Sequence, residues 1–259
     1  MTAVQQKDAQ KIALVTGGAR RIGRAIALGL AQAGWDIVVH YGQSQAAAAE
    51  TVAAITALGR RAVALQCDLD DDDATAALVA RAGAALGPVS CVVNNASLFE
   101  FDTAADFSSA LVARHMRTNL SAPILLAQAL HAVTPAASQA VVINLLDQKL
   151  FNMNPDFLSY TLSKAALHTA TTMLAQALAP TVRVVGVAPG ITMVSGDQDA
   201  AGFEKAHAVT PLGRSSTPED IAAAVCFAAA CGAITGTTLV VDGGQHLVPL
   251  ARDVMFLAT

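Results

Sequence analysis

The chain is poor in aromatic and charged residues. Of its 259 residues only 4% are aromatic and 14% are charged, whereas 54% are hydrophobic. A core of this size must therefore consist mainly of aliphatic side chains. The composition excludes a disordered or collagen-like chain, but it leaves membrane insertion to be judged from individual segments.

Long hydrophobic runs are absent. The longest apolar stretch, residues 221–234, is short of the roughly 20 residues that a membrane-spanning helix requires. Residues 1–11 have neither the apolar core nor the cleavage signal of a secretory leader. We therefore predict a cytoplasmic protein that does not associate with membranes.

The sequence also lacks patterns that bind metals or nucleic acids. Its four cysteines form no C-x-x-C pair, and no histidine stands at ligand spacing beside them. The acidic run 70–73 lacks the spaced ligands and glycine of a calcium loop, and favours a helix N-terminus. The net charge is −4 and no basic stretch is present, so nucleic-acid binding is not indicated. We predict a small molecule as the substrate, and no metal.

Short branched segments alternate with alanine-rich segments along the chain. The predicted strands are residues 11–16, 36–41, 61–66, 90–94, 140–145, 182–187 and 237–241. The predicted helices are residues 22–33, 44–58, 72–86, 108–133, 156–179 and 218–230. This order predicts an α/β, Rossmann-type, doubly wound fold: a seven-stranded, mostly parallel sheet with helices on both faces. We expect one domain over residues 1–259, with residues 189–218 as a surface loop over a ligand site.

A glycine-rich turn, TGGARRIG, follows the first predicted strand at residues 16–23. Between a strand and a helix, such a turn lets backbone N–H groups and the helix dipole face a pyrophosphate. Its place in the first strand–helix unit predicts a dinucleotide site. The cofactor-binding residues predicted in this turn are Thr16, Gly17, Arg20, Arg21, Ile22 and Gly23.

The end of the second predicted strand favours NADP(H) over NAD(H). An acidic residue there would bind the ribose hydroxyls of NAD, but the sequence reads HYGQS and the next acid is Glu50. Asp36 lies at the start of the strand, too early for that role. Arg20 and Arg21, with Ser44, can accommodate a 2′-phosphate instead. The residues predicted on the adenosine side are His40, Tyr41, Gln43 and Ser44.

Tyr160 and Lys164 stand four residues apart at the start of a predicted helix, so their side chains share one face. A free phenol has a pKa of about 10 and transfers protons poorly at neutral pH. A neighbouring ammonium stabilises the phenolate and lowers that pKa. The pair therefore predicts acid–base catalysis.

Together these motifs resemble the short-chain dehydrogenase/reductase family over nearly the whole chain. The matching features, besides the turn and Tyr160/Lys164, are Asp68-Leu69, Asn94-Asn95-Ala96, Asn119, Pro189-Gly190 and Asp242-Gly243-Gly244. The resemblance implies that Asn119 supports a water chain to Lys164, and that Lys164 also holds the nicotinamide ribose. It adds these cofactor-binding residues: Asp68, Leu69, Asn95, Ala96, Ser97, Lys164, Pro189, Gly190 and Thr192.

Two departures from the family pattern are similar to its pteridine reductase branch. Arg21 replaces the middle glycine of the usual turn, and Asp147 replaces the usual serine 13 residues before the tyrosine. The resemblance implies that Arg21 reaches the phosphates and the substrate, and that Phe99 stacks on a pterin ring. The implied catalytic residues are Asp147, Tyr160, Lys164 and Asn119, and the implied substrate-binding residues are Arg21, Ser97, Phe99, Asp147 and Tyr160.

The chemistry of a ring C=N bond gives Asp147 a role. Reducing this bond places a proton on nitrogen while hydride goes to carbon. A carboxyl group beside Tyr160 can relay that proton, and as an anion it raises the pKa of the phenol and keeps it protonated. Alternatively, Asp147 caps a local turn and Phe99 packs in a loop.

The leading prediction is an NADPH-dependent oxidoreductase that reduces a pterin, dihydropteridine or folate-like ring. The alternative is an NADP-dependent reductase of a carbonyl in a 3-oxoacyl chain or sugar ketone. A lesser alternative is a non-catalytic NADP-binding sensor. By resemblance we also expect a homotetramer, with one contact through residues 108–133 and 156–179 and another through residues 221–234.

Overall fold

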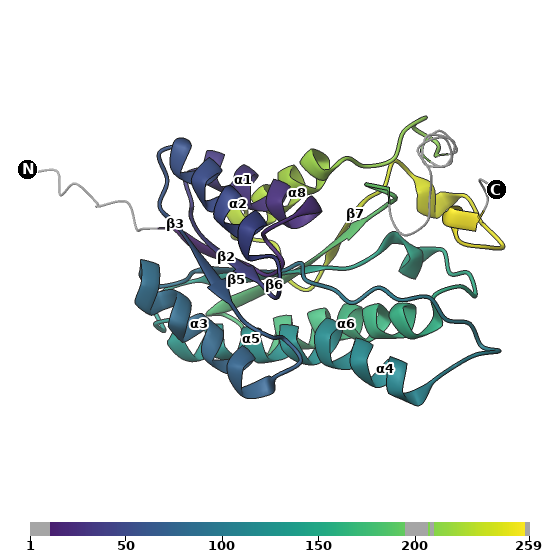
Figure 1. Ribbon diagram of the computed structural model, residues 1–259, viewed down its shortest axis with the longest axis horizontal. Coiled ribbons are helices and arrows are strands. Elements are labelled where there is room, and N and C mark those ends of the chain that lie inside the picture. The colour runs from purple at the N-terminus through teal and green to yellow at the C-terminus, as the bar shows by residue number, and fades with distance from the viewer. Residues whose placement is uncertain (1–10, 195–206, 208–209, 257–259) are drawn as a thin grey trace, which may run out of the picture.

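The computed structural model of the chain describes residues 11–194, 207 and 210–256. A seven-stranded sheet runs through it in the order β3-β2-β1-β4-β5-β6-β7, and every neighbouring pair is parallel (Figure 1). The strands are β1 (Ile12–Val15), β2 (Asp36–Tyr41), β3 (Ala62–Gln66), β4 (Cys91–Asn94), β5 (Ala140–Leu145), β6 (Val182–Pro189) and β7 (Thr238–Val241). The predicted Rossmann-type sheet is confirmed.

Helices cover both faces of the sheet (Figure 1). On one face lie α1 (Arg21–Gln32), α2 (Gln45–Ala57) and α8 (Pro218–Ala230). On the other lie α3 (Asp72–Leu86), α4 (Ser109–Met116), α5 (Ala122–Val133) and α6 (Leu158–Ala177). Four single-turn helices complete the described elements: η1 (Arg117–Ser121), η2 (Gln148–Phe151), η3 (Gln245–Leu247) and η4 (Val254–Phe256).

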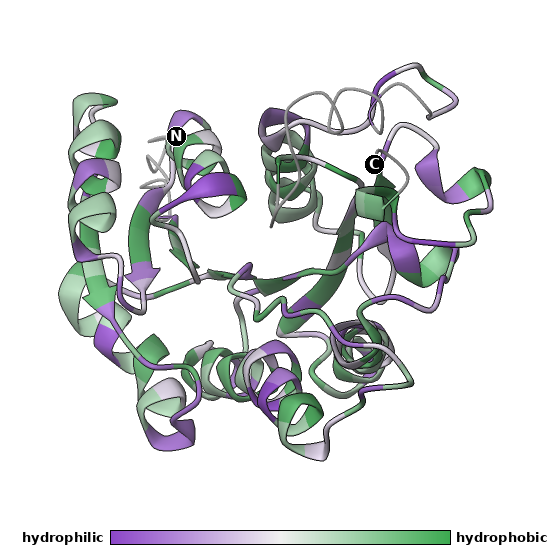
Figure 2. Cartoon of the chain, turned by 45° about the vertical axis from the view of Figure 1, so that its right-hand side comes forward, coloured by the Kyte–Doolittle hydropathy of each residue, from purple (hydrophilic) through white to green (hydrophobic). Residues whose placement is uncertain are grey.

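The aliphatic strands form two cores because successive side chains point to opposite faces of a sheet. In β1, Ala13 and Val15 belong to the core under α1 and α8, whereas Ile12 and Leu14 belong to the core on the other face. All four are fully buried. Figure 2 shows hydrophobic strands between the two helical layers. Aliphatic side chains thus fill the cores on both faces of the sheet, which explains the low aromatic content.

The predicted helix over residues 108–133 is present and contains a π-helical turn. It consists of α4, the π-helical turn η1 and α5, with Asn119 inside η1. Pro123 has no N–H to donate to the carbonyl of Asn119 four residues earlier, and its ring crowds that carbonyl. A continuous α-helical ladder is therefore impossible at this point.

The predicted helix over residues 156–179 begins two residues later than expected. Phe157, the residue before α6, has a left-handed backbone with a φ of 56°, which an α-helix does not allow. Of the predicted loop over residues 189–218, positions 195–206 and 208–209 lie outside the described residues.

Within the described ranges, no helix has the length and hydropathy that crossing a bilayer requires. In the same part of the chain, no three His, Cys, Asp or Glu side chains gather as a metal site would need. The order of the strands reverses between β1 and β4, and ligands of doubly wound sheets bind at the carboxyl ends of such strands.

Candidate active site

The carboxyl ends of β1 and β4 are joined by side chains of the predicted site. The Thr16 hydroxyl accepts hydrogen bonds from the backbone N–H groups of Asn95 and Ala96 at 2.9 and 3.0 Å. The Asn95 side-chain amide donates to the Thr16 carbonyl at 2.9 Å. The glycine turn is thereby fixed beside the segment that begins with Asn95.

The start of α1 can accept an anion. Its N-cap, Arg20, makes no side-chain capping bond, and its first turn carries no acid, so the N-terminal N–H groups keep their partial positive charge. A Cβ added to Gly23 would lie 2.2 Å from the Gly17 carbonyl oxygen, so only glycine allows the turn and helix to meet. Arg20 and Arg21 are exposed beside it. These residues fit the pyrophosphate of a dinucleotide.

The adenosine side carries no acid where an NAD-binding protein would place one. Asp36 is buried and forms ion pairs with Arg60 and Arg61, each at 2.8 Å, so it stabilises the start of β2. The end of β2 continues into the exposed residues Gly42 and Gln43. This arrangement fits a 2′-phosphate better than free ribose hydroxyls.

His40 lies behind the glycine turn. Its imidazole is 2% exposed, accepts from the Gly17 backbone N–H at 3.1 Å and lies 3.1 Å from the Cys67 carbonyl oxygen. Burial lowers the pKa of His40, since desolvation disfavours the charged ring. A neutral His40 therefore supports the turn from beneath.

A pocket of about 660 Å³ opens at this edge of the sheet. The predicted site residues that line it are Gly17, Arg20, Arg21, Ile22, Gly23, Asn95, Ala96, Ser97, Phe99, Asp147, Tyr160, Lys164, Pro189, Gly190 and Thr192. The remaining predicted residues are not among its lining: Thr16, His40, Tyr41, Gln43, Ser44, Asp68, Leu69 and Asn119. The fold thus brings the phosphate turn and the catalytic candidates into one cavity.

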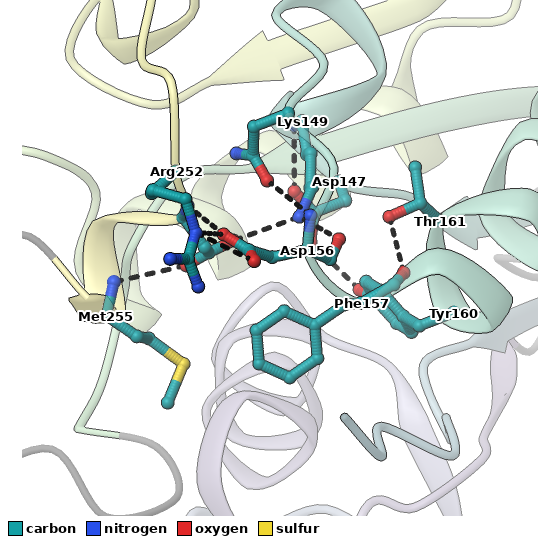
Figure 3. A network of polar contacts seen from close by, with 10 residues as sticks. Asp147, Lys149, Asp156, Phe157, Tyr160, Thr161, Arg252 and Met255 are labelled. Atoms are coloured by element: carbon teal, nitrogen blue, oxygen red, sulfur yellow. Dashed lines mark hydrogen bonds and ion pairs between the residues drawn. The ribbon is translucent and has the colours of Figure 1, made fainter. Parts of the chain in front are cut away.

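Asp147 and Tyr160 form a hydrogen-bonded pair in the wall of the pocket (Figure 3). The Tyr160 hydroxyl donates to Asp147 Oδ2 at 2.8 Å, while Asp147 Oδ1 accepts from the Lys149 backbone N–H at 2.8 Å. Asp147 therefore caps η2 with one oxygen and faces the phenol with the other. Burial raises the pKa of Asp147, and burial together with the Asp147 charge raises the pKa of Tyr160 well above 10.

Lys164 is held behind this pair. Its ammonium donates to the Leu145 carbonyl at 2.8 Å and lies 5.8 Å from the centroid of the Tyr160 ring. Burial lowers the pKa of Lys164 to about 8. The expected lowering of the tyrosine pKa by Lys164 is not what the structure shows, because burial and Asp147 dominate and keep the phenol protonated.

Asn119 positions a loop of the site. Its side chain accepts from the Leu98 N–H at 2.8 Å and donates to the Leu98 carbonyl at 3.0 Å and to the Ser163 hydroxyl at 2.9 Å. The hydroxyl of Ser97 donates to Asn119 at 3.2 Å. Asn119 thus joins the segment after β4 to α6, the helix that carries Tyr160 and Lys164.

Phe99 presents an aromatic surface at the pocket. It stacks on Phe157, with ring centroids 4.4 Å apart and planes inclined by 16°, and it meets Tyr160 edge-on at 4.7 Å. The side chain remains 42% exposed. One face of the ring is therefore covered by Phe157, and the exposed part is free to contact a ligand.

The pocket also contains residues that no motif had indicated. They are Leu145, Leu146, Gln148, Lys149, Phe157, Ile191, Met193, Gln245, Asp253, Val254 and Met255. The last three come from the end of the described chain, far in sequence from the catalytic pair. Gln148, Lys149 and Phe157 stand within three residues of Asp147 or Tyr160, and this proximity in sequence was the signal for them.

Comparison with known proteins identifies the family. The family model for short chain dehydrogenase matches residues 11–202. The chain belongs to the short-chain dehydrogenase/reductase family. This oxidoreductase is 34% identical to L-rhamnose 1-dehydrogenase (NAD(P)(+)) of a Sphingomonas strain, over 92% of this chain and 96% of that protein. It is 31% identical to 3-oxoacyl-[acyl-carrier-protein] reductase of Synechocystis, over 91% and 96%.

A solved structure agrees with the predicted branch of the family. FolM alternative dihydrofolate reductase 1 from Brucella canis, complexed with NADP, superposes with a TM-score of 0.90 at 39% identity. The match covers 95% of this chain and 97% of that one. NADP in that neighbour supports the predicted cofactor, while the named relatives include enzymes of both sugars and folates.

Proposed function

We propose that this oxidoreductase uses NADPH to reduce the ring of a pterin, dihydropteridine or folate-like compound. The observation that carries the proposal is the hydrogen-bonded pair of Asp147 and Tyr160, whose carboxylate and hydroxyl oxygens lie 2.8 Å apart in the pocket wall. A serine hydroxyl at position 147 would suit a carbonyl substrate, whose developing oxyanion requires a donor. A carboxyl group instead can supply a proton to the phenol.

The bound nicotinamide would supply hydride to a ring carbon. Tyr160 would give its proton to the adjacent ring nitrogen. The Asp147 carboxylate would then take up a proton from water and pass it to the phenolate oxygen along their hydrogen bond. The positive charge of Lys164 would stabilise the phenolate during this transfer. Phe99 would hold the flat ring against the cofactor by stacking.

The proposed cofactor residues divide between the two ends of NADP(H). Arg20, Arg21 and the start of α1 would bind the phosphates, because the arginines carry positive charge and no side chain caps the N-terminus of the helix. Lys164 would bind the nicotinamide ribose, and the adenosine would lie near Tyr41, Gln43, Ser44, Asp68 and Leu69. The NADP bound to the Brucella neighbour supports this choice of cofactor.

We also propose a cytoplasmic homotetramer of single-domain subunits. Apolar side chains remain exposed on two of the helices expected at the contacts: Leu162 and Met173 of α6 are 44% and 63% exposed, and Phe227 of α8 is 56% exposed. A second subunit would remove this surface from water.

The deciding experiment compares NADPH oxidation with dihydrobiopterin, dihydrofolate and a 3-oxoacyl thioester under identical conditions. Turnover of a pteridine substrate at least tenfold above the thioester is expected. Preference for the thioester, which the named reductase relatives make a specific alternative, would show that Asp147 merely replaces serine. Absence of turnover on all three would instead support an NADP-binding sensor.

A further inference from the structure

Residues 248–256, here called the C-terminal strap, fold back over the pocket. Asp253, Val254 and Met255 line it. The Arg252 Nε lies 3.0 and 2.9 Å from the two carboxylate oxygens of Asp156, and the Asp253 backbone N–H donates to Asp156 at 2.7 Å. Figure 3 shows Arg252 and Met255 of the strap beside Asp156 and Phe157. Because Asp156 is 3% exposed, the strap is fixed to a buried anion at the start of α6.

Lys149 fixes the Asp253 side chain. Its ammonium, 3% exposed, lies 3.2 Å from Asp253 Oδ2 and 5.3 Å from the centroid of the Phe157 ring. The backbone N–H of the same residue donates to Asp147. One buried lysine thus links the strap carboxylate, the proposed proton donor and the aromatic ring beneath Phe99.

Hydrogen-bond acceptors gather where the strap meets the pocket. Asp147, Gln148 and Asp253 all line it, and Gln148 Oε1 is buried without a partner among the described residues. Asp253 accepts from Lys149 and from the Met255 N–H at 3.1 Å, and its side chain is still 17% exposed. A carboxylate has about four lone-pair sites, so Asp253 can accept further hydrogen bonds. A ligand complementary to this end must present donors.

We propose that Asp253 is a specificity-determining residue that accepts hydrogen bonds from the N–H groups of a 2-amino-4-oxopyrimidine ring in the substrate. The inference rests on the proposed pteridine reduction and assigns the recognition of the substrate's amino edge. The Asp147–Tyr160 pair then serves the reducible ring, while Asp253, held by Lys149, fixes the orientation of the other ring. Partial burial makes this selective, since an analogue without the donors leaves the remaining lone pairs of a largely desolvated carboxylate without hydrogen bonds.

The test compares the binding of pterin and lumazine, which carry an amino and an oxo group at position 2 and both fluoresce. Each is titrated onto the NADP⁺-saturated protein. The wild type is expected to bind pterin at least tenfold more tightly. Asp253→Asn should reduce this preference about tenfold or more, because a neutral amide replaces a charged acceptor.

Two further variants separate recognition from folding. Arg252→Gln removes the ion pair with Asp156 but keeps Asp253 and its own contacts to Asp156 and Lys149, so the melting temperature should fall while the preference changes less than threefold. Asp253→Asn removes the carboxylate charge beside the buried ammonium of Lys149, which then keeps its hydrogen bond to the Asp156 carbonyl. The double variant Lys149→Met/Asp253→Asn removes both charges and should show the same loss of preference. NADP⁺ binding verifies that each variant is folded.

An unchanged preference in the folded Asp253 variants, or an equal loss in Arg252→Gln, would overturn the role of Asp253. These results leave the proposed function intact if the wild type still reduces a dihydropteridine. A wild type that neither binds pterin nor reduces a dihydropteridine would overturn both.

Discussion

At the scale of residues, the protonation state of the proposed proton donor, Tyr160, follows from burial. The pKa of Tyr160 is raised first by desolvation and then by the charge of Asp147, so the phenol carries its proton at neutral pH. The pKa of Lys164 is lowered to about 8 by burial, so its stabilising charge disappears just above neutral pH. Lys164 therefore loses its proton at a lower pH than the Tyr160 phenol does.

We expect kcat/KM for reduction to fall as the pH rises through about 8, because Lys164 loses the proton that stabilises the phenolate. The charge of Asp147 raises the pKa of Lys164, so Asp147→Asn should move this alkaline limb to lower pH as well as slow the reaction. A pH–rate profile measures both. As a control, Glu50→Gln removes an exposed charge of α2 and should leave the limb in place. A limb that does not move in Asp147→Asn would contradict this assignment.

Phe99→Ala should raise the KM for a pterin substrate about tenfold or more, because the exposed part of the ring supplies the stacking surface. Steady-state kinetics with NADPH in excess measure this. Phe107→Ala serves as the matched control, since Phe107 is an exposed phenylalanine further along the same loop that does not line the pocket. An unchanged KM in Phe99→Ala would remove the stacking role.

At the scale of elements, the end of α8 depends on a buried arginine of β6. The Arg183 guanidinium donates to the carbonyls of Ala228, Ala229 and Ile234 at 3.1, 3.1 and 2.9 Å. These are carbonyls at and just beyond the helix C-terminus, which lack helical partners. Arg183 thus fastens the helix to the sheet.

Arg183→Met should lower the free energy of unfolding by about 2–4 kcal/mol, since it leaves several buried carbonyls without donors. Urea unfolding followed by circular dichroism tests this. The control is Arg114→Met, which removes an exposed ion pair to Glu100 that is worth less than about 1 kcal/mol. Equal losses of stability in the two variants would show that Arg183 is not a special anchor.

The interruption at η1 also belongs to this scale. Alanine-rich residues 108–133 were predicted to be helical, and the structure is helical from Ser109 to Val133. The π-helical turn within it was not predicted, and it lies where Pro123 cannot donate to the Asn119 carbonyl. The proline was visible in the sequence. The hydrogen bonds of Asn119 to Leu98 and Ser163 were not visible in the sequence, since they depend on segments from two other parts of the chain.

At the scale of the whole molecule, the exposed apolar residues of α6 and α8 bear on assembly. Light scattering should give four times the subunit mass. Met173→Lys should reduce the assembly, since it places a charge in the proposed α6 contact, while Leu58→Lys, at the end of α2 and 44% exposed, should not. A wild-type monomer would contradict the tetramer.

The sheet, the glycine-rich turn and the proposed pairing of Tyr160 with Lys164 could all be predicted from the order of residues, because each depends on segments that are local in sequence. Alternation of branched and alanine-rich segments specifies parallel strands with crossover helices, and the spacing of Tyr160 and Lys164 places both on one helical face. Gly23 was visible as part of the turn. The structure adds the reason why position 23 must be glycine, which is its close approach to the Gly17 carbonyl.

Tertiary structure decided the protonation of the pair and the far wall of the pocket. The direction of the Tyr160 pKa depends on how deeply the phenol is buried and on the distance to Asp147. The strap reaches the site only because Arg252 and Asp253 contact Asp156 and Lys149, nearly one hundred residues earlier or more. Contacts between such distant segments leave no periodicity or motif in a sequence, so only the folded chain shows a second carboxylate in the pocket.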